Sequence, residues 1–379
     1  MRQPWAWSPA GPLWSRLLLK CRRDGNRRRG RTTGKFPSPG AHPFMSVLAV
    51  DIGGANIKLA SSAGPAWTVP FALWQQPEVV ASQLVGELEP QAPELVLVTM
   101  TAELCDCFAT RAEGVRFILE HVEAAAGPAA VRVWATDRGF LPLEQARAAP
   151  AHVAAGNWHA LGSWLAPLFS AGLSLSIDIG STTTDLIPLR EGGLATDSRT
   201  DPQRLARGEL VYLGAGRTPL MSLGETVSLD GQTFGTMAEH FATLADALVL
   251  AGDLSEAPHS KATADERPLT ADAAAARVLR MIGGDRDTFS HAAAVHMAQQ
   301  YRARALERLR TASRSVLGDA APDRIILSGT GTPLGRALAE EAWPEARHII
   351  LADKIGPEAS AAACAYALLR LWEKEAADV

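Results

Sequence analysis

One short pattern occurs twice in the chain and constrains its fold more than any other feature. It reads AVDIGGANIK at 49–58 and SIDIGSTTTD at 176–185. Each copy is an apolar run that reaches an Asp, turns through Gly and small polar residues, and resumes as an alternating run. Backbone N–H groups of such a turn can face a phosphate, and the adjacent carboxylate can hold a hydrated divalent cation. The repeat predicts two related half-domains that present equivalent loops to one central cleft.

A third glycine-rich turn follows an apolar strand late in the chain, at 325–334 (IILSGTGTPL). Its glycine spacing does not fit a dinucleotide-binding fingerprint. The order of two phosphate-type loops and a late Gly-Thr-Gly turn resembles the acetate and sugar kinase, Hsp70 and actin superfamily. This resemblance implies an α/β chain with a two-lobed actin-like ATPase (ribonuclease H-like) fold, a duplicated half-domain and a central cleft.

Strand and helix patterns alternate after each copy of the repeat, as expected for an α/β fold. Apolar spacing predicts single helices at 152–169 and 235–250. We expect the first lobe to span 45–170 and the second 171–379, with the C-terminal helix packing back on the first lobe.

Composition excludes several functional classes. No apolar stretch approaches the roughly 20 residues that a membrane-spanning helix needs, so no membrane association is expected. The four cysteines lack the spacing of a disulfide framework, which indicates a reducing cytoplasm. The sequence does not indicate an oligomeric state.

Residues 1–44 carry ten Lys or Arg and a single acid, Asp24, although the whole chain has a net charge of −4. No apolar face accompanies these charges, and a strand pattern starts at Met45. We therefore expect 1–44 to be a disordered basic extension or the result of a start codon assigned too far upstream. The remaining chain is acidic and would repel a polyanion, so no nucleic-acid partner is expected.

Several stretches match one narrower branch of the superfamily, which is related to the hydantoinase and oxoprolinase group. The chain resembles the tetrahydromethanopterin-linked C1 transfer pathway proteins, whose archaeal relatives are methanofuran-biosynthesis synthases. With the two repeats, the matching stretches are distributed along essentially all of 46–370. They are VTMTAELCDCF (98–108), RAEGV (111–115), VAAGNWHAL (153–161), YLGAGRTPL (212–220), FATLADALVL (241–250) and TADERPLTA (263–271).

This resemblance implies an aryl-ether-forming transferase. Such an enzyme joins a furfuryl diphosphate, an aminomethylfuran methyl diphosphate, to the phenol oxygen of γ-glutamyltyramine or of a bacterial analogue, and diphosphate leaves. Superfamily ancestry leaves an ATP-dependent kinase or a hydantoinase/oxoprolinase-type amidohydrolase as alternatives, because one scaffold hosts many chemistries. A non-catalytic nucleotide-binding assembly factor is an alternative of another class.

Candidate site residues follow from the loops. Asp51 and Asp178 occupy equivalent turns and are expected to be catalytic, unless they only cap their turns. Glu103 and Asp106 follow a buried strand, and either is a candidate base for the phenol. Asp178 and Asp185 are expected to hold Mg²⁺, the expected cofactor. The candidates for diphosphate or nucleotide binding are Gly53, Gly54, Asn56, Lys58, Gly180, Ser181, Thr182, Thr183, Gly329, Thr330 and Gly331.

Overall fold

The computed structural model describes residues 45–377, and the expectation for 1–44 lies outside these residues. The first sheet has the strand order β3-β2-β1-β4-β5-β6. Its central strand β1 pairs antiparallel with β2 and parallel with β4. All residues of β1 and β4 are buried, as expected for strands covered on both faces. The strands are β1 (Val47–Ile52), β2 (Asn56–Ser61), β3 (Ala66–Pro70), β4 (Leu95–Met100), β5 (Ala130–Ala135) and β6 (Gly139–Pro142).

The second sheet has the order β10-β8-β7-β13-β14, with β9 paired to β8. Its central strand β7 pairs antiparallel with β8 and parallel with β13, so it repeats the pairing of β1. The strands are β7 (Leu173–Ile179), β8 (Thr184–Arg190), β9 (Gly193–Leu194), β10 (Leu210–Val211), β13 (Arg324–Ser328) and β14 (Arg347–Ile350).

The two sheets confirm the duplicated half-domain. Each is built on a hairpin whose first strand also receives a parallel strand from later in the chain. The cross-strand register is equivalent as well, because Asp51 lies opposite Lys58 and Asp178 lies opposite Asp185. The chain therefore has the predicted α/β, two-lobed actin-like fold. The lobe boundary predicted at residue 170 stays a prediction.

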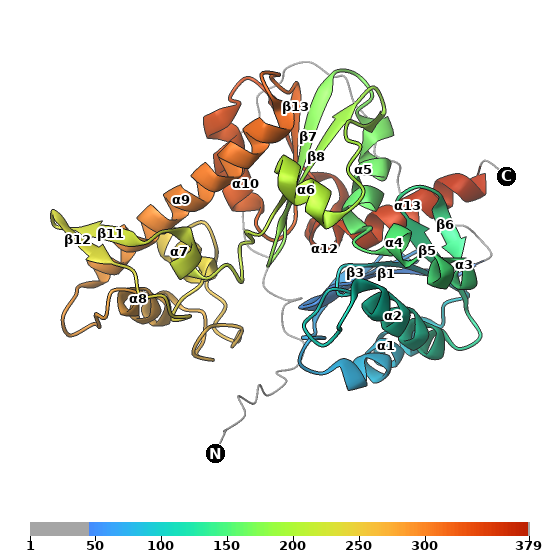
Figure 1. Cartoon of the computed structure of the whole chain (residues 1–379), viewed down its shortest axis with the longest axis horizontal. Coiled ribbons are helices and arrows are strands. Elements are labelled where there is room, and N and C mark those ends of the chain that lie inside the picture. The colour runs from blue at the N-terminus through green and yellow to red at the C-terminus, as the bar shows by residue number, and fades with distance from the viewer. Residues whose placement is uncertain (1–44, 378–379) are drawn as a thin grey trace.

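Helices α5 (Asn157–Leu168) and α13 (Ala363–Ala377) lie between the two sheets (Figure 1). One apolar cluster joins them to Ala49 and Leu97 of the first sheet and to Ile187 and Ile326 of the second. The C-terminal helix thus packs on the face of the first sheet that is turned toward the second. The opposite face of the first sheet carries α1 (Val80–Leu88) and α2 (Arg111–Ala126).

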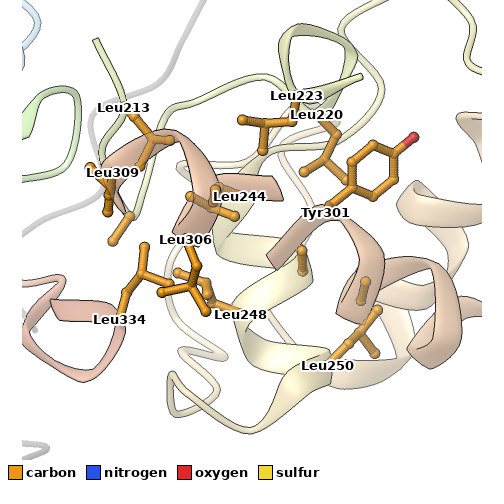
Figure 2. Packing of buried hydrophobic residues seen from close by; sticks show 14 of the residues in the cluster. Leu213, Leu220, Leu223, Leu244, Leu248, Leu250, Tyr301, Leu306, Leu309 and Leu334 are labelled. Atoms are coloured by element: carbon orange, nitrogen blue, oxygen red, sulfur yellow. The ribbon is translucent and has the colours of Figure 1, made fainter. Parts of the chain in front are cut away.

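The other face of the second sheet is covered by α9 (His291–Leu317) and α10 (Thr332–Ala342). Figure 2 shows leucines of α7 (Leu244–Ala251), α9 and α10 meeting in this core beside Tyr301. The hairpin of β11 (Thr226–Leu229) and β12 (Gln232–Gly235), with α7 and α8 (Ala271–Arg280), forms the far end of the second lobe (Figure 1).

Two helix predictions were wrong in extent. The helix predicted over 235–250 begins only at Leu244, because Thr243 and Asp246 form a capping box there. The helix predicted over 152–169 is interrupted between α4 (Pro150–Val153) and α5, where Ala155 has a positive φ of 49°. None of the helices in the described part of the chain combines the length and the apolar character needed to cross a membrane.

The remaining helical elements are short and connect the larger ones. They are η2 (Pro77–Val79), η3 (Glu89–Gln91), α3 (Leu143–Ala148), α6 (Asp201–Arg207), η4 (Leu220–Leu223), α11 (Ala352–Ile355) and α12 (Pro357–Ala361).

Candidate functional site

The two repeats fold into the same turn. The Gly53 N–H donates to the Asn56 carbonyl at 2.9 Å, and the Gly180 N–H donates to the Thr183 carbonyl at 2.9 Å. The turns face each other, because Asn56 Nδ2 of the first lobe donates to Ser181 Oγ of the second at 3.3 Å. The structure therefore brings both predicted phosphate loops to one place.

Four amides at these turns point to an anion site. Among residues 45–377, the N–H groups of Gly54, Ala55, Ser181 and Thr182 have no hydrogen-bond acceptor. Consecutive amides left free in a turn form a concave site that favours negatively charged oxygens. All four residues are partly exposed, so the turns can accept phosphate oxygens from solvent.

The third glycine turn lies against the second repeat. A Cβ on Gly329, which has φ of 82°, would lie 2.3 Å from the Ile179 carbonyl oxygen and 2.9 Å from Asp178 Oδ1. A Cβ on Gly331 would lie 2.2 Å from the Ile179 side chain. Only glycine permits this approach, which places the exposed Thr330 and the N-terminus of α10 beside Asp178.

The first repeat holds an ion pair between a buried carboxylate and a partly exposed lysine. Asp51 Oδ2 lies 3.8 Å from Lys58 Nζ, and Asp51 Oδ1 has no hydrogen-bond partner in the described part of the chain. Burial raises the pKa of Asp51 to about 6, although the Lys58 charge opposes this effect. Burial lowers the pKa of Lys58, but Asp51 and the carboxylates of the second repeat outweigh it and raise that pKa overall.

The second repeat has a carboxylate at both equivalent positions. Asp178 Oδ1 accepts a hydrogen bond from Ser328 Oγ at 2.6 Å. Burial raises the pKa of Asp178, against the opposing effects of Lys58 and Ser328. Asp185 is buried and pairs with Arg204 Nη1 at 2.8 Å. Lys58 in the first lobe and Asp185 in the second thus occupy matching positions with opposite charges.

The carboxylates at the two turns are the candidate ligands for Mg²⁺. Within residues 45–377, no group of three or more His, Cys, Asp and Glu side chains is close enough to form a metal cage. Mg²⁺ commonly keeps several waters and uses one or two carboxylates together with substrate phosphates. Asp178 and Asp185, with the orphaned Asp51 Oδ1 nearby, are carboxylates of the kind that this mode uses, and Asp185 also pairs with Arg204. A magnesium site here stays a prediction.

Glu103 and Asp106, the two candidate bases, differ sharply in environment. The Glu103 side chain is 1% exposed, and its Oε2 has no hydrogen-bond partner among the described residues. Its Oε1 lies 3.6 Å from Arg111 Nε. Burial raises the pKa of Glu103 to about 7, a value suited to a general base near neutral pH. Asp106 is exposed, and no hydrogen bond or ion pair holds it within 45–377.

Arg217 is a site residue that the sequence reasoning missed. The backbone N–H of Arg217 donates to the Ser181 carbonyl at 2.7 Å. The segment before Arg217 also lies close to this turn, because a Cβ on Gly214 would be 2.4 Å from the carbonyl carbon of Ser181. The side chain is exposed, with no carboxylate within ion-pair distance in the described part of the chain. Its charge acts on the Cys105 thiol, opposing the burial that raises the pKa of that thiol to about 11. The only available signal was its place in the family-like stretch 212–220.

Four further residues that hold the candidate groups were also missed. Their partners come from distant segments, so no local pattern marks them. They are Arg111, Asp201, Arg204 and Ser328.

The chain is similar in sequence to two synthases of known name. The chain is 27% identical over 334 residues to (4-{4-[2-(γ-L-glutamylamino)ethyl]phenoxymethyl}furan-2-yl)methanamine synthase of Methanocaldococcus jannaschii, covering 87% of this chain and 98% of that protein. The synthase of the same name from Methanococcus vannielii is 30% identical over 125 residues, 33% of this chain and 56% of that protein.

Among solved structures, a nucleotide-free acetone carboxylase aligns with a TM-score of 0.48 and 11% identity, over 86% of this chain and 70% of that one. The sequence profile of the hydantoinase/oxoprolinase family matches residues 94–371, which is most of the chain. The chain therefore belongs to the hydantoinase/oxoprolinase family.

Proposed function

We propose that this protein is a transferase of methanofuran-type cofactor biosynthesis. It condenses an aminomethylfuran methyl diphosphate with the phenol of γ-glutamyltyramine, or of an analogue, and releases diphosphate. Similarity over 98% of the length of the M. jannaschii synthase supports this reaction class. The observation that carries the proposal is the pair of facing turns whose free amides adjoin a buried carboxylate cluster. We place the enzyme in the cytoplasm, within tetrahydromethanopterin-linked C1 metabolism.

The diphosphate is bound by the two turns in this proposal. The amides of Gly54 and Ser181 donate to its oxygens, and the Arg217 and Lys58 side chains offset its charge. Preorganised donors aimed at a leaving group stabilise the charge that develops as the bond breaks. Mg²⁺ held by Asp178 and Asp185 would further neutralise the diphosphate. Because the whole diphosphate leaves, no phosphoryl group is transferred to an acceptor in this reaction.

The acceptor phenol is deprotonated by Glu103. An unperturbed phenol has a pKa near 10, so it needs a base at neutral pH. The bond between the furfuryl CH₂ carbon and diphosphate breaks, and its electron pair leaves with the diphosphate. The phenol oxygen forms the new bond to that carbon, and its proton passes to the Glu103 carboxylate, whose buried Oε2 has no hydrogen-bond partner among the described residues.

A second candidate function is an ATP-dependent kinase or amidohydrolase. The observation that favours it is the third glycine turn, which lies beside Asp178 at the N-terminus of α10 and could hold part of a nucleotide. A non-catalytic assembly factor would bind nucleotide at the same place without turnover.

The proposal is tested by measuring diphosphate release. The purified protein is incubated with furfuryl diphosphate and Mg²⁺, with and without a tyramine-type phenol. We expect release only when the phenol is present, with no requirement for ATP. Asp137→Asn, a change in a partly exposed carboxylate paired with Arg138, serves as the control and should release diphosphate at the wild-type rate. Turnover that depends on ATP and yields ADP would favour the second candidate.

A further inference from the structure

A short helix of the second lobe contacts the candidate site at two points. Helix α6 begins at Asp201, directly after its N-cap Thr200, which forms a capping box with Gln203 in the first turn. The capping box fixes where the helix starts, and therefore where its first side chains point. In Figure 1, α6 lies in front of the second sheet, on the side toward the first lobe.

The first contact crosses between the lobes. Asp201 Oδ2 accepts from Arg111 Nη2 at 2.8 Å, and Arg111 is the first residue of α2 in the first lobe. The same guanidinium approaches Glu103 Oε1 with its Nε at 3.6 Å. Arg111 and Asp201 are each about three-quarters buried, so the pair is shielded from solvent more than a surface ion pair is.

The second contact anchors the helix. Arg204 is 1% exposed, pairs with Asp185 Oδ1 at 2.8 Å and donates to the Glu209 carbonyl at 3.0 Å. Its guanidinium also lies 4.2 Å from the centre of the Trp158 ring. Because Arg204 contacts Asp185, the Glu209 carbonyl and the Trp158 ring, it fixes the position of α6 and therefore of Asp201.

We propose that Arg111 and Asp201 form an interlobe positioning pair that holds Glu103 for proton transfer from the acceptor. The inference rests on the proposed function. Backbone amides of Glu103 and Ala155 also hydrogen-bond the Glu103 carboxylate, and Arg111 is the charged group that faces it. Asp201 of the second lobe holds this arginine, so the pair links the base of the first lobe to α6.

The charges around Glu103 predict how its pKa should change in variants. Arg111 from α2 and Asp201 from α6 face its carboxylate, and the ionisable groups of Cys105 and Tyr212 lie in the same neighbourhood. Burial raises the Glu103 pKa to about 7. Hydrogen bonds from the backbone amides of Glu103 and Ala155 lower it, as does the charge of Arg111, and the charge of Asp201 raises it. Removing the two charges one at a time must therefore move this pKa in opposite directions.

The experiment uses Arg111→Gln and Asp201→Asn, since Asn still accepts a hydrogen bond but lacks the charge. The acid limb of kcat/KM against pH should move up by about one pH unit in Arg111→Gln and down in Asp201→Asn. Arg111→Lys keeps the charge and should restore most of the wild-type profile. Arg138→Gln, an exposed arginine of the first lobe paired with Asp137, is the matched control and should leave the profile unchanged.

A second readout does not depend on turnover. The Glu103 carboxyl is titrated by ¹³C NMR in the full chain, with its signal assigned through Glu103→Gln. Opposite shifts in the pKa of Glu103 in the two variants, with no ether formed, would support the control of Glu103 by Arg111 and Asp201 and would sink the proposed function. Ether formation with both variants shifted the same way, or with neither shifted, would overturn the positioning pair. If Arg111→Gln does not fold, Asp201→Asn and Arg111→Lys test the proposal instead. An unchanged pKa of Glu103 in Asp201→Asn would then overturn it.

Discussion

Glu103→Gln should make the protein more stable at pH 8 while removing most of its activity. The folded state raises the pKa of Glu103 from 4.5 to about 7, mainly because the side chain is buried. The folded chain therefore binds this proton more tightly than the unfolded chain does. Stability from this group is fully present below about pH 4.5 and is lost as pH rises through about 7.

The size of the effect follows from the shift. One pKa unit corresponds to about 1.4 kcal/mol, so ionising Glu103 at pH 8 costs the fold about 3 kcal/mol. Gln is nearly isosteric and carries no charge, and it escapes this cost. Arg111 is not stranded by the change, because Asp201 still accepts from it at 2.8 Å.

The assay is urea unfolding at pH 5, 6, 7 and 8 for the wild type and Glu103→Gln. The difference in free energy of unfolding should be small at pH 5 and grow to about 3 kcal/mol in favour of the variant at pH 8. Glu120→Gln, an exposed carboxyl on α2, is the matched control and should show no such trend. A pH-independent difference, or a less stable variant at pH 8, would refute the reasoning. The rate should fall by about 10²–10⁴ if Glu103 is the base.

Three further changes test other parts of the account. Asp178→Asn should melt at a temperature no lower than the wild type, because burial raises the pKa of Asp178, and should lower the turnover rate by about 10²–10³; near-native turnover would make this carboxylate structural. Asp246→Ala leaves the fully buried Arg277 without the carboxylate that binds its Nε and Nη2, so chemical denaturation should show a loss of about 3–5 kcal/mol. Gly331→Ala places a Cβ 2.2 Å from the side chain of Ile179, which precedes the Gly180 turn, so calorimetry should show weakened binding of inorganic diphosphate; unchanged binding would show that the third glycine turn does not support the Gly180 turn.

The fold was predictable because its main signal is local and repeated. The two Asp-Ile-Gly patterns predict both hairpin turns, and in the structure these turns have equivalent hydrogen bonds at Gly53 and Gly180. The helix over 235–250 was misjudged because apolar spacing alone cannot show where a helix starts. The capping box at Thr243 decides that point; Gly235 ends the β11–β12 hairpin, and residues 236–242 form neither helix nor strand.

The site was predictable only in part, for a physical reason. Loop glycines and the aspartates beside them carry a pattern in the sequence, whereas their supporting partners do not. Ser328 reaches Asp178 from β13, and Arg204 reaches Asp185 from α6. Such pairs depend on tertiary packing. The environment that separates Glu103 from Asp106 is likewise a matter of burial, which three residues of sequence spacing cannot show.

The most direct test of the proposed reaction follows the phenol oxygen. The acceptor is labelled with ¹⁸O at its phenol group and incubated with furfuryl diphosphate, Mg²⁺ and the full chain, without ATP. The account predicts an aryl ether that keeps the ¹⁸O and an equal amount of unlabelled diphosphate, both identified by mass. An ether without the label, or product that appears only with ATP and in step with ADP, would contradict it.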